Sequence, residues 1–137
     1  MRASRVVLVA AIGASCAAAV LPTGASAATG TALTITYYED ADRRSERTRW
    51  TLRCAPAGGT HPRPAKTCRE LARLGWQAFR PAPANRACTE IYGGPQLAIV
   101  SGRVAGRAVW ARLTRIDGCQ IERWDRVPSL LPPGGVR

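Results

Sequence analysis

Few side chains in this sequence are able to do chemistry: one histidine, nine carboxylates and five cysteines. His61 lies in a segment rich in proline and glycine, between Thr60 and Pro62. A Ser-His-Asp or Cys-His catalytic arrangement would have to be built around this histidine. No Gly-x-Ser-x-Gly sequence is present. We therefore predict a loop histidine held by turn hydrogen bonds rather than a catalytic base.

Two carboxylates, Glu90 and Asp117, could flank a glycosidic bond as acid and base. Nothing in their spacing along the chain indicates such a pair, so a small secreted hydrolase or ribonuclease is not expected. The residue types imply no cofactor.

Four of the cysteines, Cys54, Cys68, Cys88 and Cys119, lie beyond the N-terminal segment. An even number of cysteines in a small exported chain is typical of a disulfide framework. None of these cysteines has the Cys-x-x-Cys spacing of a zinc or redox site, so we expect no metal. Four cysteines permit three pairings, and their spacing alone does not choose among them.

The first 27 residues have the features of a secretory signal peptide. Arg2 and Arg5 give a positive start, residues 6–20 are mostly apolar, and an Ala-Ser-Ala cleavage site ends at Ala27. The apolar run is short for a membrane span. Cys16 falls within this segment and is expected to be removed with it. We predict a secreted, extracellular protein with no membrane attachment after cleavage.

The chain carries a formal charge of +11, and the loss of the two arginines in the signal segment lowers it only to about +9. This balance suits nucleic acid or another acidic partner. However, the basic residues are scattered and nearly all are arginine, with Lys66 as the one lysine. The scatter resembles codon bias, so nucleic acid is not an expected partner. A basic extracellular domain that binds a polyanion is the alternative function.

Alternating apolar and polar side chains predict half-buried strands at residues 32–38 and 48–54. The densely charged residues 39–47 between them predict a turn, so the two strands should pair as a long hairpin. The apolar faces of the two strands consist of Leu33, Ile35, Tyr37, Trp50, Leu52 and Cys54.

Residues 55–65 are rich in proline and glycine and predict a loop, after which a short helix fits residues 65–74. The core face of that helix should include Cys68, Leu71 and Ala72, which are spaced i, i+3 and i+4.

Residues 97–100 and 108–114 read as two further strands. Together these elements predict an α+β domain: an antiparallel sheet of four or five strands, covered on one face by one or two short helices and holding two disulfides. The domain is expected to occupy residues 28–127, and residues 128–137 to form a loose C-terminal tail.

Residues 88–95 form a segment without strand alternation that begins with a cysteine and holds two large apolar side chains. Pro95 restricts the backbone near its end. An exposed, extended loop stiffened at both ends is what a substrate-like protease inhibitor needs, because preorganisation removes the ordering cost of binding.

Several stretches resemble the Streptomyces subtilisin inhibitor family, and the resemblance extends over roughly residues 33–124. In chain order these stretches are Leu52-Arg53-Cys54-Ala55-Pro56, Gly58-Gly59-Thr60-His61-Pro62, Cys68 with Leu71, Cys88-Thr89-Glu90-Ile91-Tyr92, Gly102-Arg103-Val104-Ala105-Gly106-Arg107-Ala108-Val109 and Gly118-Cys119. The resemblance implies disulfides Cys54–Cys68 and Cys88–Cys119. It further implies an inhibitor rather than an enzyme, an extracellular serine protease as partner, and homodimers that pack sheet against sheet.

The resemblance also implies a reactive-site bond between Glu90 and Ile91. Glu90 would enter the primary specificity pocket of the protease, with Cys88, Thr89 and Tyr92 as further contacts. The implied targets are subtilisin-like or trypsin-like serine endopeptidases. Glutamate departs from the methionine, lysine or arginine that the family often presents, which points to a glutamate-preferring protease.

Overall fold

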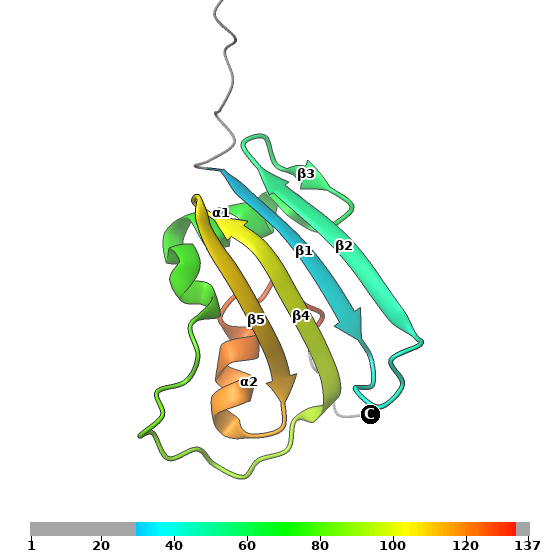
Figure 1. Ribbon diagram of the computed structural model, residues 1–137, viewed down its shortest axis with the longest axis vertical. Coiled ribbons are helices and arrows are strands. Elements are labelled where there is room, and N and C mark those ends of the chain that lie inside the picture. Colours follow the sequence, from blue (N-terminus) through cyan, green and yellow to red (C-terminus); the bar gives the residue numbers. More distant parts are fainter. Residues whose placement is uncertain (1–29, 134–137) are drawn as a thin grey trace, which may run out of the picture.

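The computed structural model describes residues 30–133, in which five strands form one sheet with the order β3-β2-β1-β4-β5 (Figure 1). Every neighbouring pair of strands is antiparallel. The predicted signal peptide lies outside the described residues. The strands are β1 (Thr31–Tyr38), β2 (Arg47–Cys54), β3 (Gly58–Gly59), β4 (Gly94–Val104) and β5 (Arg107–Arg115).

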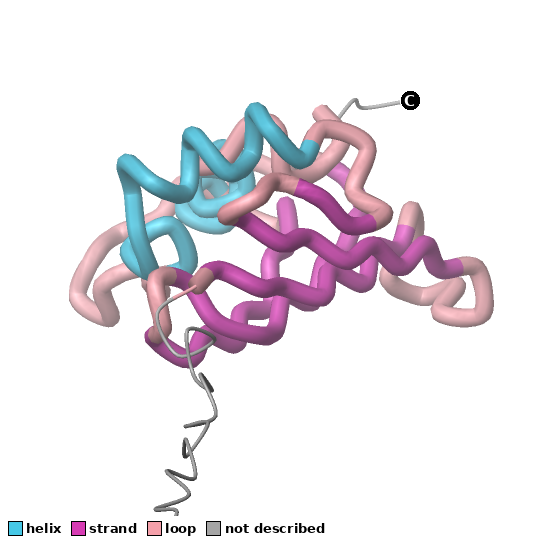
Figure 2. Tube along the Cα trace, turned by 90° about the horizontal axis from the view of Figure 1, so that it is seen from above, coloured by secondary structure: helices cyan, strands magenta, loops and turns pink. Residues whose placement is uncertain are grey.

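The helices α1 (Pro64–Leu74), η2 (a 3₁₀ helix, Gly75–Phe79) and α2 (Gly118–Asp125) lie together on one side of the sheet (Figure 2). This arrangement confirms the predicted α+β class, with β1 and β2 paired as the expected hairpin. None of the helices between residues 30 and 133 has the length and apolar character needed to cross a bilayer. On the other side of the sheet, Arg49 and Trp110 are exposed.

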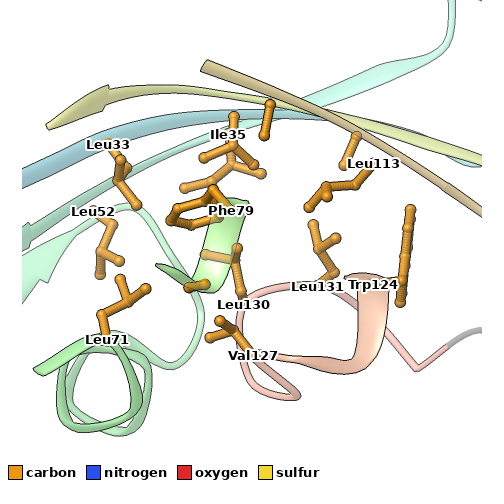
Figure 3. Close-up of a cluster of buried hydrophobic side chains, with 14 of the residues drawn as sticks. Leu33, Ile35, Leu52, Leu71, Phe79, Leu113, Trp124, Val127, Leu130 and Leu131 are labelled. Atoms are coloured by element: carbon orange, nitrogen blue, oxygen red, sulfur yellow. The ribbon is translucent and has the colours of Figure 1, made fainter. Parts of the chain in front are cut away.

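The hydrophobic core lies between the sheet and the helices (Figure 3). The predicted alternation holds in β1, where Leu33 and Ile35 are buried and pair in register with Leu52 and Trp50 of β2. Phe79 at the end of η2 packs beneath these strands. Because the two strands point alternate side chains inward, one face is apolar and the other is left polar.

The C-terminal segment corrects the prediction of a loose tail at residues 128–137. Ser129, Leu130 and Leu131 are almost fully buried, and both leucines belong to the core cluster (Figure 3). The chain instead packs against the core, and the carbonyls of Leu130 and Leu131 accept hydrogen bonds from His61 and Arg63. Residues 134–137 of the predicted tail lie outside the described residues.

The buried face of α1 also differs from the prediction. Ala72 is exposed, whereas Thr67 and Glu70 are buried. The physical reason is that the C-terminal segment packs along this helix: the Ser129 hydroxyl lies 2.9 Å from the Thr67 hydroxyl and donates to Glu70 at 2.6 Å. The helix therefore carries polar groups where the incoming backbone needs hydrogen-bond partners.

Both disulfides implied by the family resemblance are present. Cys54–Cys68 joins the end of β2 to α1, with 5.6 Å between the Cα atoms. Cys88–Cys119 joins the loop before β4 to the first turn of α2, with 5.3 Å between the Cα atoms. The first disulfide thus connects a strand to a helix, and the second connects a loop to a helix.

Candidate functional site

The loop before β4 exposes two large apolar side chains next to each other. Between η2 and β4 the chain has no regular secondary structure, and Figure 1 shows it running along the lower edge past α2. Ile91 and Tyr92 are 61% and 60% exposed, and Glu90 is exposed beside them. We refer to residues 88–93 as the exposed loop.

The N-terminal end of the exposed loop is tied to α2 by a covalent bond and a hydrogen bond. Cys88 is bonded to Cys119, and the N–H of Gly118 donates to the carbonyl of Thr89 at 2.9 Å. A Cβ on Gly118 would overlap the Thr89 hydroxyl, so this close approach requires glycine. The backbone is therefore fixed one residue before Glu90.

The C-terminal end of the exposed loop is tied to β5. The N–H of Gly93 donates to the carbonyl of Arg115 at 2.7 Å, and Nε of Arg115 donates to the carbonyl of Gly93 at 3.1 Å. A Cβ on Gly93 would meet the Ile121 side chain at 2.8 Å. Gly94 follows with a φ of +133°, which favours glycine.

Arg115 is itself held in a buried setting. It is 8% exposed, its NH1 lies 3.6 Å from a carboxylate oxygen of Asp125, and its guanidinium lies 5.8 Å from the centre of the Trp124 ring. A planar guanidinium fixed on several sides loses little further freedom when it holds a backbone carbonyl. Arg115 therefore links α2 to the exposed loop through a side chain that is held in one position.

A third tie lies further upstream. Arg86 and Glu122 of α2 form an ion pair, with 2.7 Å between Nη2 of Arg86 and Oε2 of Glu122. The hydrogen bond and charge of Arg86, together with the charge of Arg126, lower the pKa of Glu122 below its ordinary value. Since both partners are about half exposed, this pair orients the loop more than it stabilises the fold.

The carboxylates considered as an acid and base are used differently. Asp117 caps α2, with its Oδ1 accepting from the N–H of Gln120 at 2.9 Å, while Glu90 is exposed on the loop. Asp117 also lies within 4.8 Å of the sulfurs of Cys88 and Cys119. These sulfurs are bonded to each other, so they are not thiolates that could bind a metal with Asp117.

His61 has a structural role. It is 3% exposed, its Nδ1 accepts from the N–H of Arg63 at 3.2 Å, and its Nε2 donates to the carbonyl of Leu130 at 2.9 Å. Its ring and that of Trp50 are arranged edge to face, with 5.8 Å between their centroids. The predicted turn hydrogen bond is confirmed, and the bond to Leu130 adds a link to the C-terminal segment.

Sequence reasoning missed the residues that support the exposed loop, above all Arg115 and Gly118. One signal was available for Arg115, because it occupies an inward position two residues after Leu113 in an alternating strand. A charged residue at such a position needs a polar partner in the interior. Gly118 carries no comparable signal before the position of Thr89 is known.

Comparisons with known proteins agree with this architecture. A sequence model of the family described as subtilisin inhibitor-like matches residues 27–114, which include the exposed loop and three of the four bonded cysteines. Subtilisin inhibitor-like protein 1 of Streptomyces cacaoi is 36% identical over 77 residues. The aligned part covers 53% of this chain and 69% of that protein.

Proposed function

The chain belongs to the subtilisin inhibitor-like family, and we propose that it inhibits a serine endopeptidase by offering the exposed loop as a substrate that is released slowly. The observation that supports this function is an exposed Glu90-Ile91-Tyr92 tip between two fixed ends. Such a loop binds without the ordering cost that a flexible peptide incurs.

In this proposal the scissile bond is Glu90–Ile91. Cys88 and Thr89 pair with the backbone of the enzyme as an added strand, and the catalytic serine attacks the carbonyl carbon of Glu90. The new amine of Ile91 then stays near the acyl group, because Gly93 is bonded to Arg115. Two groups held together react at high effective concentration, so religation competes with hydrolysis.

The side chain of Glu90 sets the preferred target. Moving an ionised carboxylate into an apolar pocket without a partner costs several kcal/mol. A pocket with cationic or polar groups compensates for that loss. We therefore propose a glutamate-preferring serine protease as the best partner, ahead of subtilisin-like and trypsin-like enzymes.

The site of action follows from the N-terminal sequence. With residues 1–27 as a signal peptide, the protein would be secreted and would meet proteases outside the cell. Its two disulfides suit that oxidising setting.

The test is a panel of purified serine proteases that cleave after glutamate, after lysine or arginine, or after large apolar residues. Inhibition constants are measured for each, and mass spectrometry identifies any bond cut in the inhibitor. We expect the glutamate-preferring enzyme to be inhibited most strongly, with slow cleavage at Glu90–Ile91. Full activity of every protease would contradict the proposal and favour polyanion binding without inhibition, and cleavage confined to another bond would contradict the placement of the loop.

A further inference from the structure

The connection between β5 and α2 lies beside the exposed loop. It consists of Ile116 and Asp117, which follow Arg115 at the end of β5 and precede Gly118 at the start of α2. Figure 1 shows this connection at the same end of the sheet as the exposed loop. We refer to residues 116 and 117 as the connector.

The connector is bounded by the same two residues that hold the ends of the exposed loop. The carbonyl of Arg115 accepts from the N–H of Gly93 at 2.7 Å, and the N–H of Gly118 donates to the carbonyl of Thr89 at 2.9 Å. Consecutive Cα atoms lie about 3.8 Å apart, so a connector of this length cannot move far from the loop unless one of these hydrogen bonds breaks. The connector and the loop tip therefore keep a fixed relative position.

Ile116 presents a large apolar side chain to solvent beside the loop tip. It is 56% exposed, which is close to the exposed fractions of Ile91 and Tyr92. The other residue of the connector is engaged elsewhere, because the carboxylate of Asp117 accepts from the N–H of Gln120. One exposed apolar residue needs no special explanation. Three such residues held together by the same hydrogen bonds form a surface suited to a protein partner.

A protease that binds the exposed loop has to cover more surface than the loop offers. A stable protein–protein interface buries about 800 Å² on each partner and involves roughly 20–30 residues a side. The exposed loop spans only residues 88–93, and Gly93 within it is buried. The remaining contacts must come from the surface next to the loop, and the connector is bonded directly to both loop ends.

We propose that Ile116 is a second contact with the protease and helps to determine which protease is inhibited. This inference rests on the proposed function, in which the protease attacks the Glu90–Ile91 bond. The primary pocket of the enzyme receives Glu90, while Ile116 meets the enzyme surface outside that pocket. An apolar side chain gains most where the partner surface is also apolar and excludes water.

The fixed position of Ile116 makes this contact selective. An enzyme with an apolar depression at the matching place gains buried area. An enzyme with a charged or protruding group there loses hydration or clashes, and the connector cannot withdraw to relieve the conflict. Proteases that share a preference for glutamate, but differ in the surface beside their clefts, are therefore inhibited to different extents.

The first test is the inhibition constant of Ile116→Ala and Ile116→Asp against the glutamate-preferring protease. Ile116→Ala should raise the constant about five- to 30-fold, and Ile116→Asp should raise it further. The matched controls are Leu74→Ala and Leu74→Asp. Leu74 is also an exposed apolar residue, but it lies on α1, toward the other end of the sheet (Figure 1). These controls should leave inhibition unchanged.

The outcomes separate this inference from the proposed function. If the wild type inhibits the protease and the variants at residues 116 and 74 have equal inhibition constants, Ile116 is not a contact, although the proposed function stands. If the wild type inhibits no serine protease, both are overturned.

The second test locates the contact and measures its selectivity. A benzophenone-bearing residue placed at position 116 should crosslink to the bound protease under ultraviolet light, whereas the same group at position 74 should not. Ile116→Ala should also change the ratio of the inhibition constants for two glutamate-preferring proteases. Equal crosslinking from the two positions would overturn the contact. An equal loss of inhibition against both proteases would overturn the role of Ile116 in specificity.

Discussion

Arg115 and Gly93 exchange two hydrogen bonds, one through the backbone of Arg115 and one through its side chain. The pair joins the last residue of β5 to the residue that follows Tyr92, so the position of the exposed loop depends on a side chain in the interior. This coupling distinguishes the loop from an ordinary surface connection.

Substitution of Arg115→Met tests this coupling. The change removes the hydrogen bond to Gly93 but retains an apolar stem, and a charge-assisted bond of this kind contributes about 1.5–3 kcal/mol. We expect inhibition to weaken by about ten- to 100-fold and cleavage of the loop to accelerate. The control is Arg112→Met, an exposed position on the same strand. A variant that loses stability but keeps its inhibition constant would limit Arg115 to a structural role.

Exchange of Glu90 should change which protease is inhibited. Glu90→Met should strengthen inhibition of a subtilisin-like enzyme by about 2–4 kcal/mol, because no carboxylate is then moved into its apolar pocket. Glu90→Lys should direct the loop toward trypsin-like enzymes. The remaining contacts are unchanged, so the dissociation rate should carry most of the difference. Glu46→Met on the β1–β2 turn serves as the control, and identical inhibition by all variants would place the reactive bond elsewhere.

The two disulfides should have separable roles. Removing either pair by serine substitution should cost about 3–4 kcal/mol of unfolding free energy, for sequence separations of 14 and 31 residues. Only the loss of Cys88–Cys119 should also speed cleavage of the loop by the protease. Urea denaturation and a cleavage time course measure the two effects. Equal cleavage rates in both double variants would show that the loop does not depend on its own disulfide.

His61→Ala should destabilise the fold without removing inhibition. The substitution deletes a buried ring and its bonds to Arg63 and Leu130, at a cost of about 2–4 kcal/mol. His61→Gln, whose amide can donate to the Leu130 carbonyl, should recover part of the loss. Urea denaturation and inhibition constants at low temperature check both variants. A hydrolytic activity that disappears with His61 would contradict the structural role.

The buried carboxylate of Glu70 should make the stability of the fold sensitive to acid. Burial opposes ionisation of Glu70, but the hydroxyl and N–H of Ser129 and the charges of Lys66 and Arg73 outweigh it and lower its pKa below 4.5. Because the folded pKa is the lower one, ionised Glu70 stabilises the fold above about pH 4.5, and this contribution is lost as the pH falls through the folded pKa.

The matching measurement is the unfolding free energy of the wild type and Glu70→Gln as a function of pH. The wild type should be more stable than the variant by about 1–3 kcal/mol near pH 7. This difference in unfolding free energy should become smaller below pH 4.5. Glu46→Gln on the exposed β1–β2 turn is the control. A gap that is independent of pH would show that the charge of Glu70 contributes nothing.

The strands were predictable because their burial follows a local period. In β1 the apolar residues Leu33 and Ile35 alternate with threonines, and both apolar side chains point to the core. The ends of the longer strands were harder to predict from the sequence. Strand β4 runs from Gly94 to Val104, beyond the predicted residues 97–100. Pairing with β5 keeps these additional residues in the strand, although they show no clear apolar pattern.

The C-terminal packing and the loop supports could not be read from local patterns. Leu130 and Leu131 lie between Pro128 and Pro132, and their burial depends on core residues contributed by the sheet and the helices. Helix α2 buries Arg123, whose burial lowers its pKa with help from the nearby charge of Arg126. Its guanidinium is accommodated by the carbonyls of Arg80 and Arg112. Such pairings join residues distant in the sequence, so they emerge only from the fold.

The bond between Cys88 and Cys119 makes the region between these residues a closed covalent ring. Any single cut of the backbone within that ring leaves both pieces attached, so a cut chain weighs one water more than an intact one and migrates as one species until it is reduced. Neither piece can diffuse away, and re-forming the broken bond is a reaction within one molecule. Damage to the exposed loop is therefore reversible in principle for as long as the sulfur bridge survives.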